Sequence, residues 1–552
     1  MTSLPPIDRT PSAYNYQLLI KHLLTSPINR ASKNQIVYRD QARFTYPQFV
    51  ERVHRAANLL SGLGAKTGMT IAVMEWDSQR YLDLYFAIPM LGCVMQTVNI
   101  RLSPDQMLYT LNHAAADIVL CNADFVPMLE PLLDKLETVK HYIAISEDGS
   151  VPASKIPFAG EYETLLAQAT ACFDFPEFDE NVRMSTFYTS GTTGLPKGVY
   201  YSHRQMMLHT LAVASTFGTA PVQGRLHQDD VYMAITPMFH VHAWGMPYVA
   251  TMLGIKQVYA GRYTPDMLLQ LIAKEGVTYS HCVPTILHMI LSHPMAKEVD
   301  LSRWKVLVGG SALPKGLAKA ALDRGIDVFT GYGMSETGPL QIINHVPTDQ
   351  LGGDTDHQAS VRVRTGRPAL LCDVRAVDPE MKPLPSDGKS TGEIVFRSVW
   401  TTQGYYKNPS ASEELWQGGW MHSGDIGSFG PDGVLVISDR VKDVIKTGGE
   451  WVSSLDLENL ISAHPCVSEV AVIGVKDAKW GERPVALVVL KAGETGDEAE
   501  IKRYMMTFAD KGVISKYGVP ERVLFVEALD KTSVGKLDKK VLRVKFADVG
   551  SA

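Results

Sequence analysis

The sequence predicts an α/β protein with a large N-terminal domain and a small C-terminal domain. Three observations lead to this prediction. Short apolar runs alternate with amphipathic stretches through most of the first two-thirds of the 552-residue chain. Residues 348–438 are instead rich in Gly, Asp and short β-like runs, and a mixed pattern returns after residue 438. Dense strand–helix alternation is typical of parallel sheets covered by helices, whereas the Gly- and Asp-rich stretch predicts a β-rich subdomain.

The first two-thirds of the chain predict two helix-covered sheets. Apolar residues recur at helical spacing over residues 46–63, which predicts a helix there. Compact apolar runs predict buried strands at residues 70–74, 118–121, 142–145, 231–235 and 304–308. Ligands of open α/β sheets bind beyond the carboxyl ends of the strands. We therefore expect the loops after these strands to surround one site.

The stretch most like a membrane span covers residues 84–100. Pro89, Gly92 and Gln96 interrupt it, Asp83 precedes it, and it is short for a transmembrane helix. We expect a buried helix that leads into a strand. The N-terminal residues lack the basic and apolar regions of a secretory signal. These features predict a soluble, cytoplasmic protein with no transmembrane segment and at most peripheral membrane contact.

The last third of the chain predicts the subdomain and the small domain. Residues 392–396 and 434–437 are strand candidates, and Asp432-Gly433 is a hairpin-type turn. Beyond them we expect helices near residues 455–462 and 498–508, and strands at residues 470–475, 485–490 and 523–526. The predicted domains are therefore 1–438, with a β-rich subdomain at about 348–438, and 439–552.

Composition excludes several classes of protein. Hydrophobic residues make up 45% of the chain and charged residues 20%, as in an ordinary folded protein. The formal net charge of −6 provides no basic field for nucleic acid or for an anionic membrane. The six cysteines are scattered and form no Cys-x-x-Cys pair. Their pattern favours reduced thiols over a disulfide framework or a zinc site.

The run Tyr188-Thr-Ser-Gly-Thr-Thr-Gly-Leu-Pro-Lys-Gly-Val199 indicates phosphate binding. Glycines let backbone N–H groups approach an anion, hydroxyls bind phosphate oxygens or Mg²⁺, and Lys197 adds a positive charge. A flexible surface loop is the alternative, but it would not require a lysine and a proline between its glycines. A Walker loop is disfavoured because Pro196 and Gly198 flank Lys197. The Gly-Lys-Ser at residues 388–390 has Pro383 where a Walker loop has its first glycine.

This run resembles the phosphate-binding signature of the adenylate-forming superfamily, which includes acyl-CoA synthetases, peptide-synthetase adenylation domains and luciferases. Four further segments resemble motifs of this family in the same order. The resemblance implies ATP, Mg²⁺ and coenzyme A as cofactor and substrates, with acyl-adenylate and pyrophosphate formed first and acyl-CoA and AMP second. Thr189 is expected to contact magnesium and Lys197 to contact phosphate.

The segment Thr330-Gly-Tyr-Gly-Met-Ser-Glu-Thr337 resembles the adenine and magnesium motif of the family. Two glycines bracket Tyr332, so the backbone can pass close to a planar ligand while the ring packs against it. Glu336 offers a hard oxygen ligand for Mg²⁺ on a polyphosphate. A strand–loop–helix junction capped by Ser335 or Thr337 is compatible with this interpretation.

Three segments nearer the C-terminus complete the resemblance. Asp425 in Ser423-Gly-Asp-Ile-Gly matches the aspartate that binds ribose, although a lone Asp-Gly turn is usually structural. Arg440 matches the ribose–phosphate region and Lys442 the domain hinge, although alternating charges also suit a solvated strand face. Lys536 matches the lysine that contacts the α-phosphate and the carboxylate during adenylation. The family moves its C-terminal domain between the two steps, which implies that Lys536 serves only the first step and that the small domain is mobile.

The resemblance implies a site of three overlapping sets. The expected catalytic residues are Thr189, Lys197, Glu336 and Lys536, of which Thr189 and Glu336 bind the metal. The expected nucleotide-binding residues are Thr189, Ser190, Gly191, Thr192, Thr193, Gly194, Lys197, Gly310, Ser311, Thr330, Gly331, Tyr332, Gly333, Met334, Ser335, Glu336, Asp425, Arg440, Lys442, Lys446 and Trp451. The expected acyl-site residues are His240, Val241, Trp244, Gly310 and Pro339.

The acyl site is predicted from residues 237–248, which resemble the segment that lines the pocket of medium- and long-chain fatty-acyl-CoA synthetases. It contains no acidic residue that would meet an amino group, which disfavours an amino-acid substrate. Trp244 is either a movable wall of an apolar tunnel or a fixed core aromatic. His240 either caps the carboxylate end of the pocket or satisfies a buried hydrogen bond.

Three functions compete. The leading one is an ATP-dependent fatty-acid:CoA ligase. A CoA ligase for a short, thioether or aryl acid is the alternative within the superfamily. From another class, the chain is a free-standing loader of a carrier protein or a non-catalytic acyl-adenylate-binding protein. Intact Lys536, Glu336 and phosphate run disfavour the non-catalytic protein. A homodimer is compatible with every one of these functions.

Overall fold

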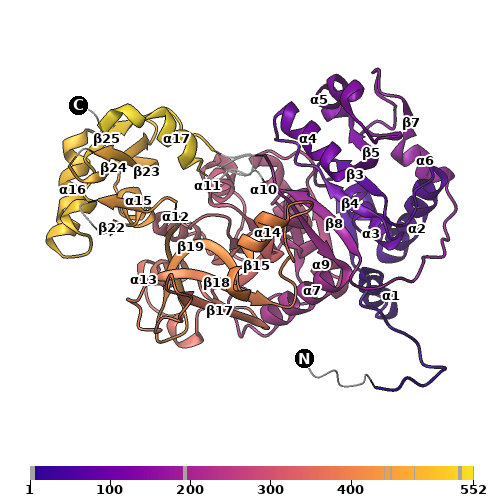
Figure 1. Ribbon diagram of the computed structural model, residues 1–552, viewed down its shortest axis with the longest axis horizontal. Helices are drawn as coiled ribbons and strands as arrows, with labels where there is room; N and C mark the ends of the chain where they lie inside the picture. Colours follow the sequence, from indigo (N-terminus) through magenta and orange to yellow (C-terminus); the bar gives the residue numbers. More distant parts are fainter. Residues whose placement is uncertain are drawn as a thin grey trace.

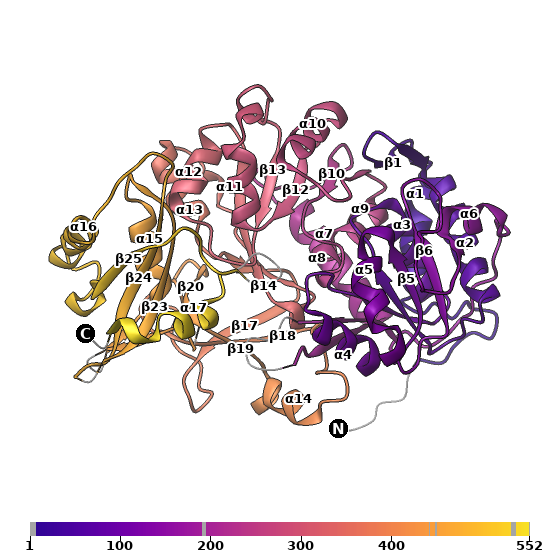
Figure 2. The ribbon, with the colours of Figure 1, turned by 90° about the horizontal axis from the view of Figure 1, so that it is seen from above.

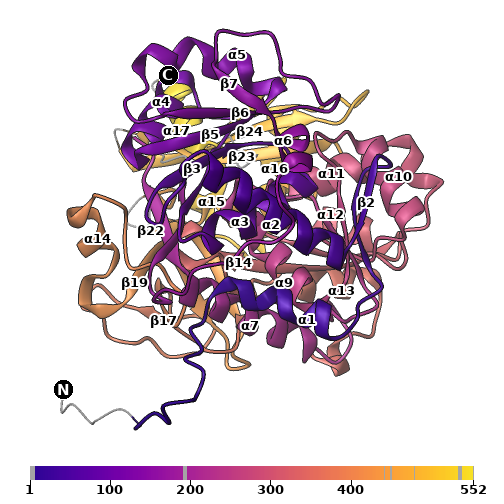
Figure 3. The same cartoon turned by 90° about the vertical axis from the view of Figure 1, so that its right-hand side faces the viewer.

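The computed structural model describes residues 7–189, 195–440, 442–447, 450–477, 479–531 and 537–550, with the backbone alone at residues 450, 451, 548 and 550. Two large sheets lie side by side in the N-terminal part, and a four-stranded sheet packs beside them. A five-stranded sheet forms the small C-terminal body at the left of Figure 1. The first described residues extend away from the sheets (Figures 1 and 3). The predicted α/β fold, with a large and a small domain, is confirmed.

The first sheet has seven strands, all parallel except the edge strand β9. In spatial order they are β7 (Phe158–Glu161), β6 (His141–Ile145), β5 (Ala116–Asn122), β3 (Thr70–Met74), β4 (Val94–Thr97), β8 (Arg183–Tyr188) and β9 (Gly198–Ser202). Its main helices are α2 (Tyr46–Gly62), α3 (Gln79–Met90), α4 (Pro104–Ala114), α5 (Val126–Leu129) and α6 (Tyr162–Gln168). Figure 3 shows α2 and α3 side by side next to the strands.

The second sheet has nine strands, with parallel strands in its centre and antiparallel strands at both edges. In spatial order they are β16 (Arg367–Pro368), β15 (Leu340–Ile343), β14 (Asp327–Gly333), β13 (Lys305–Val308), β12 (Tyr279–Cys282), β10 (Val231–Ala234), β11 (Lys256–Tyr259), β1 (Gln35–Tyr38) and β2 (Ala42–Thr45).

Helices cover both faces of this second sheet. One face packs on α10 (Pro265–Glu275), α11 (Pro284–Ser292), α12 (Lys315–Leu322) and α13 (Thr355–Arg362), which lie together along one side in Figure 2. The other face shares a single core with the first sheet, to which α1 (Thr25–Asn29), α7 (His203–Gly218) and α9 (Met246–Leu253) lie close. Because one core joins the two sheets, the loops at their carboxyl edges are held in fixed relation to each other.

The four-stranded sheet is antiparallel throughout. It contains β17 (Cys372–Val377), β18 (Gly392–Ser398), β19 (Met421–Phe429) and β20 (Leu435–Arg440), and α14 (Pro409–Leu415) lies between β18 and β19 in the chain. Its core also takes in Ile342 of β15 and Tyr332 of β14. The sheet is therefore packed directly against the end of the nine-stranded sheet.

The C-terminal sheet is covered on both faces. Its strands are β21 (Ile445–Thr447), β22 (Glu450–Val452), β23 (Val467–Asp477), β24 (Gly481–Leu490) and β25 (Arg522–Phe525). Helices α15 (Ser454–Ser462) and α16 (Glu498–Asp510) pack on one face and α17 (Lys539–Lys545) on the other. In Figures 1 and 2, α17 lies toward the N-terminal part of the molecule.

A few hydrogen bonds join β20 to the C-terminal body. One carboxylate oxygen of the buried Asp439 accepts from the backbone N–H and from the hydroxyl of Ser454, both at 2.6 Å. Lys539 donates to the same hydroxyl at 2.7 Å and forms an ion pair with Glu458 at 2.7 Å. The start of α15 therefore contacts both the last strand of the N-terminal part and α17.

Local sequence explains where α7 begins. The Ser202 hydroxyl accepts from the backbone N–H of Gln205, and the Gln205 side chain accepts from the backbone N–H of Ser202. This capping box satisfies two N–H groups that the first turn of a helix leaves unpaired. Since β9 ends at Ser202, the strand passes directly into the helix.

Several predicted elements are confirmed. The strand at residues 70–74 is β3, and the helix predicted for residues 46–63 is α2. The apolar stretch at residues 84–100 contains the end of α3 and strand β4, and all of its residues are buried. Within the described residues, no helix has both the length and the apolar character needed to cross a bilayer.

Candidate active site

The phosphate-binding run connects β8 to β9 at the carboxyl edge of the first sheet. The backbone N–H of Thr189 donates to the carbonyl of Lys197 at 3.0 Å, which closes the hairpin at its base. A Cβ on Gly198 would lie 3.2 Å from the Tyr188 ring, so glycine fits this close approach. Ser190, Gly191, Thr192, Thr193 and Gly194, which are predicted nucleotide-binding residues, lie outside the described residues.

Tyr405 brings two predicted site residues together. The Lys197 ammonium lies 4.6 Å from the centre of the Tyr405 ring. The Tyr405 hydroxyl donates to the carboxylate of the buried Glu336 at 2.6 Å. Burial, and then the negative charge of Glu336, raise the pKa of Tyr405, so its hydroxyl remains a donor. A cation from the first sheet and a carboxylate from the second sheet thus meet on one side chain that the sequence analysis did not single out.

The donor set at Glu336 fits a magnesium ion that is held largely by substrate. Among the described residues, no group of three or more His, Cys, Asp or Glu side chains is arranged to hold a metal ion. Mg²⁺ is commonly bound by one or two carboxylates together with substrate phosphate oxygens and water. A single buried carboxylate beside a phosphate-type loop satisfies that requirement, with Thr189 at the base of the loop.

A second constellation lies where the second sheet meets the four-stranded sheet. The Tyr332 hydroxyl donates to one carboxylate oxygen of Asp425 at 2.5 Å. Arg440, which is paired with Asp425 in register across β19 and β20, places its Nε 3.3 Å from the other oxygen. Burial and the Asp425 charge raise the pKa of Tyr332, which keeps this hydroxyl protonated. The three residues form an edge with one aromatic ring, one carboxylate and one exposed cation.

The segment after β14 differs from the junction expected from sequence. Residues Ser335–Thr337 form a single 3-10 turn rather than the start of a helix, and β15 follows at Leu340. The residue before the turn is Met334, so neither Ser335 nor Thr337 is its N-cap. A Cβ on Gly333 would lie 1.7 Å from the carbonyl oxygen of Pro339, so the chain folds back tightly here and no helix can form.

The predicted acyl-site segment contains an unusual left-handed turn, α8 (Val241–Trp244). All four residues have positive φ, between 47° and 59°, and Gly245 continues the pattern at 72°. L-amino acids disfavour this conformation by roughly 1–2 kcal/mol per residue. Residues in such conformations cluster at functional sites, where the packing of the surrounding residues holds the strained backbone in place.

Trp244 lies between two strands of the second sheet. Its ring centre is 5.0 Å from that of His281 on β12, at an interplanar angle of 31°. A Cβ on Gly309, directly after β13, would lie 3.0 Å from the Trp244 ring and 2.8 Å from the carbonyl oxygen of Gly331. Trp244 is 5% exposed and belongs to the core that joins the two large sheets. The tryptophan therefore lies beside the backbone of the predicted adenine motif.

The other predicted site residues lie on β14 or in the loops that follow β10, β13 and β14. Gly310, with φ of 81°, follows Gly309 in the loop after β13, and the exposed Ser311 comes next. Thr330 is buried and donates to the carbonyl of Arg364 at 2.5 Å. Pro339 is buried, and His240 is half-buried just before the left-handed turn. These residues surround the carboxyl edge of the second sheet, as the strand pattern predicts.

Four predicted residues belong to the C-terminal part, away from Glu336 in the chain, and one of them lies outside the described residues. Lys442 is exposed in the turn after β20, and Lys446 is exposed on β21. Trp451 belongs to β22, where only the backbone is described. Lys536 lies outside the described residues, between Lys531 and Leu537, which form an isolated antiparallel bridge.

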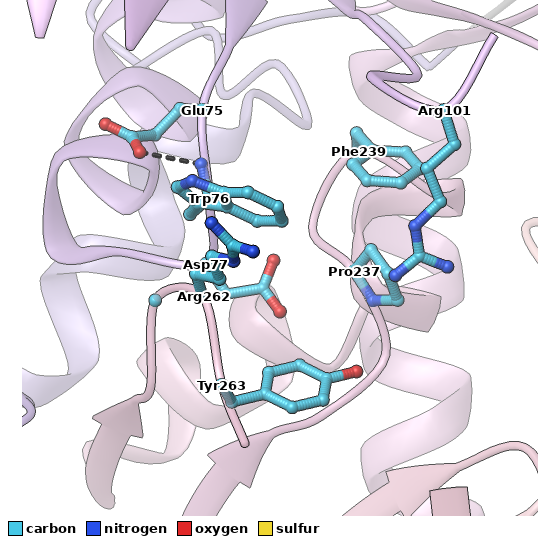
Figure 4. Close-up of a pocket in the computed structure, with 9 residues that line it drawn as sticks. Glu75, Trp76, Asp77, Arg101, Pro237, Phe239, Arg262 and Tyr263 are labelled. Atoms are coloured by element: carbon cyan, nitrogen blue, oxygen red, sulfur yellow. Dashed lines mark hydrogen bonds between the residues drawn. The ribbon is translucent and has the colours of Figure 1, made fainter. Parts of the chain in front are cut away.

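A cavity of about 190 Å³ at the same edge was not found by sequence reasoning. It is lined by residues that follow β3, β4, β10 and β11, namely Glu75, Trp76, Asp77, Arg101, Pro237, Phe239, Gly261, Arg262 and Tyr263. Figure 4 shows Trp76 and Arg262 on one side and Arg101 and Phe239 on the other. Burial raises the pKa of both Glu75 and Asp77 to about 7. Because its residues lie far apart in sequence, only the two sheets bring them together.

Two buried histidines near the left-handed turn were also missed. Neither ring nitrogen of His209 or of His242 has a hydrogen-bond partner within the described part of the chain. A Cβ on Gly245 would lie 2.7 Å from the His209 ring, and one on Gly338 would lie 3.3 Å from it. Burial lowers the pKa of His209 to about 3. His209 is therefore a neutral ring packed closely against the backbone at Gly245 and at Gly338.

His209 should make the protein sensitive to acid. Its pKa is lower in the folded than in the unfolded chain, so the unfolded chain binds the extra proton between pH 6.5 and about 3. Its contribution to stability is complete above pH 6.5 and falls by about 1.4 kcal/mol per pH unit below it. The His209→Leu variant should lose about 1.4 kcal/mol less than the wild type between pH 7.5 and pH 5.5 in urea unfolding. His357→Leu, at an exposed position on α13, is the control, and an unchanged pH dependence in His209→Leu would contradict the prediction.

The predicted phosphate-binding and acyl-site residues lie at the carboxyl edges of the two large sheets, and a smaller α/β body follows β20. This arrangement is typical of a nucleotide-dependent α/β enzyme. Comparison with known proteins identifies it further. Residues 26–406 match the AMP-binding enzyme family, and residues 456–536 match the AMP-binding enzyme C-terminal domain.

Individual relatives agree with the family match. A long-chain-fatty-acid–CoA ligase of Thermus thermophilus is 37% identical over 507 residues, covering 91% of this chain and 90% of the relative. A 3-methylmercaptopropionyl-CoA ligase of Ruegeria lacuscaerulensis is 36% identical, covering 96% of this chain and 98% of the relative. The solved structure of the anthranilate CoA ligase AuaEII in complex with anthranoyl-AMP has the same fold, with a TM-score of 0.85 and 24% identity, covering 98% of this chain and 99% of that chain.

The chain therefore belongs to the AMP-binding enzyme family and, within it, to the AMP-forming acyl-CoA synthetases of the adenylate-forming superfamily. Enzymes of this class use ATP, Mg²⁺ and CoA together with a carboxylic acid. The resemblance drawn from the motifs is confirmed at the level of the family.

Proposed function

We propose that the protein activates a fatty acid in two half-reactions. In the first, a carboxylate oxygen of the acid attacks the α-phosphorus of ATP, and the bond to the β-phosphate breaks to release pyrophosphate. In the second, the sulfur of CoA attacks the carbonyl carbon of the acyl-adenylate, the thiol loses its proton, and AMP leaves. Neither step needs a nucleophile from the protein, so the contribution of the chain is positioning and charge stabilisation.

The contact of Lys197, Tyr405 and Glu336 is the observation that carries this proposal. Lys197 would bind phosphate, while Glu336 would hold Mg²⁺ together with phosphate oxygens, with Thr189 as a further oxygen ligand. When bound, Mg²⁺ supplies positive charge that offsets the charge developing on the phosphate oxygens. Tyr405 keeps the Glu336 carboxylate oriented, because its hydroxyl is a permanent donor at 2.6 Å.

The edge formed by Tyr332, Asp425 and Arg440 would hold the nucleoside. We assign the adenine to the Tyr332 ring and its flanking glycines, and the ribose hydroxyls to Asp425. Arg440 is 55% exposed at its side chain and lies 3.3 Å from Asp425, so it can reach a phosphate or ribose oxygen without leaving the carboxylate. Lys536 would contact the α-phosphate and the carboxylate during the first step.

The left-handed turn supports an apolar acid as substrate. Val241 and Trp244 are buried, and no acidic residue occurs between Pro237 and Tyr248. An amino group would therefore meet no countercharge on this segment. A CoA ligase for a thioether acid is the second candidate, because the Ruegeria relative named for such an acid is as similar as the fatty-acid relative.

The cavity shown in Figure 4 is suited to part of CoA. Arg101 and Arg262 contribute two guanidinium groups to its lining, and guanidinium groups bind phosphate well. The cavity lies at the same carboxyl edge as the left-handed turn, and its lining residues Pro237 and Phe239 directly precede that turn in the chain. We further propose a domain boundary at residues 438/439, movement of the C-terminal domain between the two steps, and a cytoplasmic location.

Pyrophosphate release and CoA consumption test the function directly. The purified full-length protein would be assayed with straight-chain acids from acetate to stearate and with 3-methylmercaptopropionate and benzoate. A maximum in kcat/KM among the straight-chain acids is expected. A maximum for the thioether or aryl acid would favour the second candidate, and pyrophosphate release without CoA consumption would favour a carrier-protein loader.

Truncation of Trp244 should change the chain-length preference. In the Trp244→Ala variant the buried ring no longer fills the space beside Gly309, so longer acids gain room and short acids lose contact area. One or two methylene groups are worth about 1–3 kcal/mol in an apolar pocket, or roughly 10- to 200-fold in kcat/KM. The acid panel measures this change. The same profile in the variant and in the wild type would make Trp244 a core residue only.

A further inference from the structure

His281 lies directly beneath the Trp244 ring and is fully buried on β12. Its own ring is held at both nitrogens. Tyr232 on β10 places its hydroxyl 2.7 Å from Nε2, and Thr236, two residues after β10, places its hydroxyl 3.0 Å from Nδ1. The Tyr232 and His281 rings are also nearly parallel, at an interplanar angle of 15°.

The hydrogen bonds of this histidine restrain its ring. The Thr236 hydroxyl lies 3.0 Å from Nδ1 and 3.3 Å from the backbone carbonyl of His281, and the Tyr232 hydroxyl lies 2.7 Å from Nε2. Burial lowers the pKa of His281 to about 3, so the ring remains neutral. Each ring nitrogen therefore has a hydroxyl partner, and the two partners together restrain the orientation of the ring.

This rigid ring and a glycine support the two sides of Trp244. The centre of the Trp244 ring lies 5.0 Å from that of His281 on β12, at a tilt of 31°, while a Cβ on Gly309 after β13 would lie only 3.0 Å from the far edge of the indole. The position of Trp244 thus depends in part on a histidine of β12.

We propose that His281, held by Tyr232 and Thr236, is a positioning residue that fixes Trp244 and thereby sets the depth of the acyl site. The proposal rests on the proposed function, because it assigns acid selectivity to this wall. It predicts that removing either hydroxyl frees the imidazole ring, lets Trp244 shift and broadens the range of acids accepted. Both hydroxyls bond to His281, so we expect their effect on Trp244 to pass through that ring.

The test uses two variants and one matched control in the full-length protein. Tyr232→Phe and Thr236→Val each remove one partner of His281. Tyr279→Phe is the control, because Tyr279 lies two residues from His281 on the same strand, is fully buried, and has a hydroxyl with no partner among the described residues. Each of the two variants should change the ratio of kcat/KM for a long acid to that for a short acid by about 3- to 30-fold, with the KM for ATP unchanged.

A double-mutant cycle separates positioning from general destabilisation. In a Trp244→Ala background, Tyr232→Phe and Thr236→Val should no longer change the chain-length ratio. Shifts of equal size with and without Trp244, or an equal shift in Tyr279→Phe, would overturn the proposal. If either variant fails to fold, the other carries the test.

A readout that is independent of catalysis distinguishes this proposal from the proposed function. The difference in fluorescence between the wild type and Trp244→Phe isolates the emission of Trp244. Tyr232→Phe should alter that emission, whereas Tyr279→Phe should not. A protein that activates no acid in the panel would refute the proposed function, while an unchanged Trp244 emission in both Tyr232→Phe and Thr236→Val would refute the positioning role.

Discussion

Replacement of Glu336 by glutamine is expected to slow acyl-adenylate formation by about 10²- to 10³-fold while leaving the fold intact. Glutamine keeps an oxygen that accepts from the Tyr405 hydroxyl, so the hydrogen bond of 2.6 Å has a replacement acceptor. The negative charge that would hold Mg²⁺ beside the phosphates is lost. Pyrophosphate release at saturating acid, measured over a range of Mg²⁺ concentrations, gives the rate.

Glu147→Gln is a matched control for that experiment. Glu147 also accepts from a tyrosine hydroxyl, that of Tyr38 at 2.7 Å, but it follows β6 and forms its ion pair with Arg80. Its variant should retain the wild-type rate. A Glu336→Gln protein that is folded and equally active at every Mg²⁺ concentration would remove Glu336 from the metal site.

The second large effect is expected at Lys536. The Lys536→Ala variant should lose acyl-adenylate formation by about 10²- to 10³-fold, because a cation at the α-phosphate offsets the charge that develops during attack. Thioester formation from supplied acyl-adenylate and CoA should remain within a few-fold of the wild type. No pyrophosphate leaves in that step, so no cation is needed to offset its charge. Quenched-flow measurement of each half-reaction gives the two rates.

The neighbouring Lys540 provides the control for Lys536. It is exposed on α17 and lies in the same lysine-rich segment, so Lys540→Ala should leave both half-reactions unchanged. Equal loss of both half-reactions in Lys536→Ala would contradict the assignment of this lysine to the first step and, with it, the movement of the C-terminal domain between steps.

Local patterns in the sequence were sufficient for a number of the buried strands and for the family. The run at residues 71–74 is apolar throughout because β3 is buried on both faces, which is a property visible without the fold. The motif residues Thr330, Tyr332 and Glu336 are adjacent in sequence, so their common location at the end of β14 follows from their spacing. Asp425 and Arg440 are likewise joined by a single hairpin.

Contacts between distant segments were beyond sequence reasoning. Tyr405 and Glu336 are 69 residues apart, and Tyr232 and His281 are 49 residues apart, so neither pair produces a periodic signal. The cavity between the two sheets depends on strands from both halves of the N-terminal part. The left-handed turn gave no signal either, because Val241, Ala243 and Trp244 are not residues that favour positive φ.

That turn has a consequence for how the substrate range of such an enzyme can change. Four residues in left-handed conformations cost roughly 4–8 kcal/mol, which is comparable to the net stability of a domain. A replacement within Val241–Trp244 therefore alters the backbone equilibrium as well as the shape of the wall, so a change in acid preference is accompanied there by a change in stability. His281 lies on a regular strand and Gly309 directly follows one, so replacing either residue does not involve the cost of a left-handed backbone. New acid preferences, whether evolved or designed, should therefore arise most readily on the neighbouring strands.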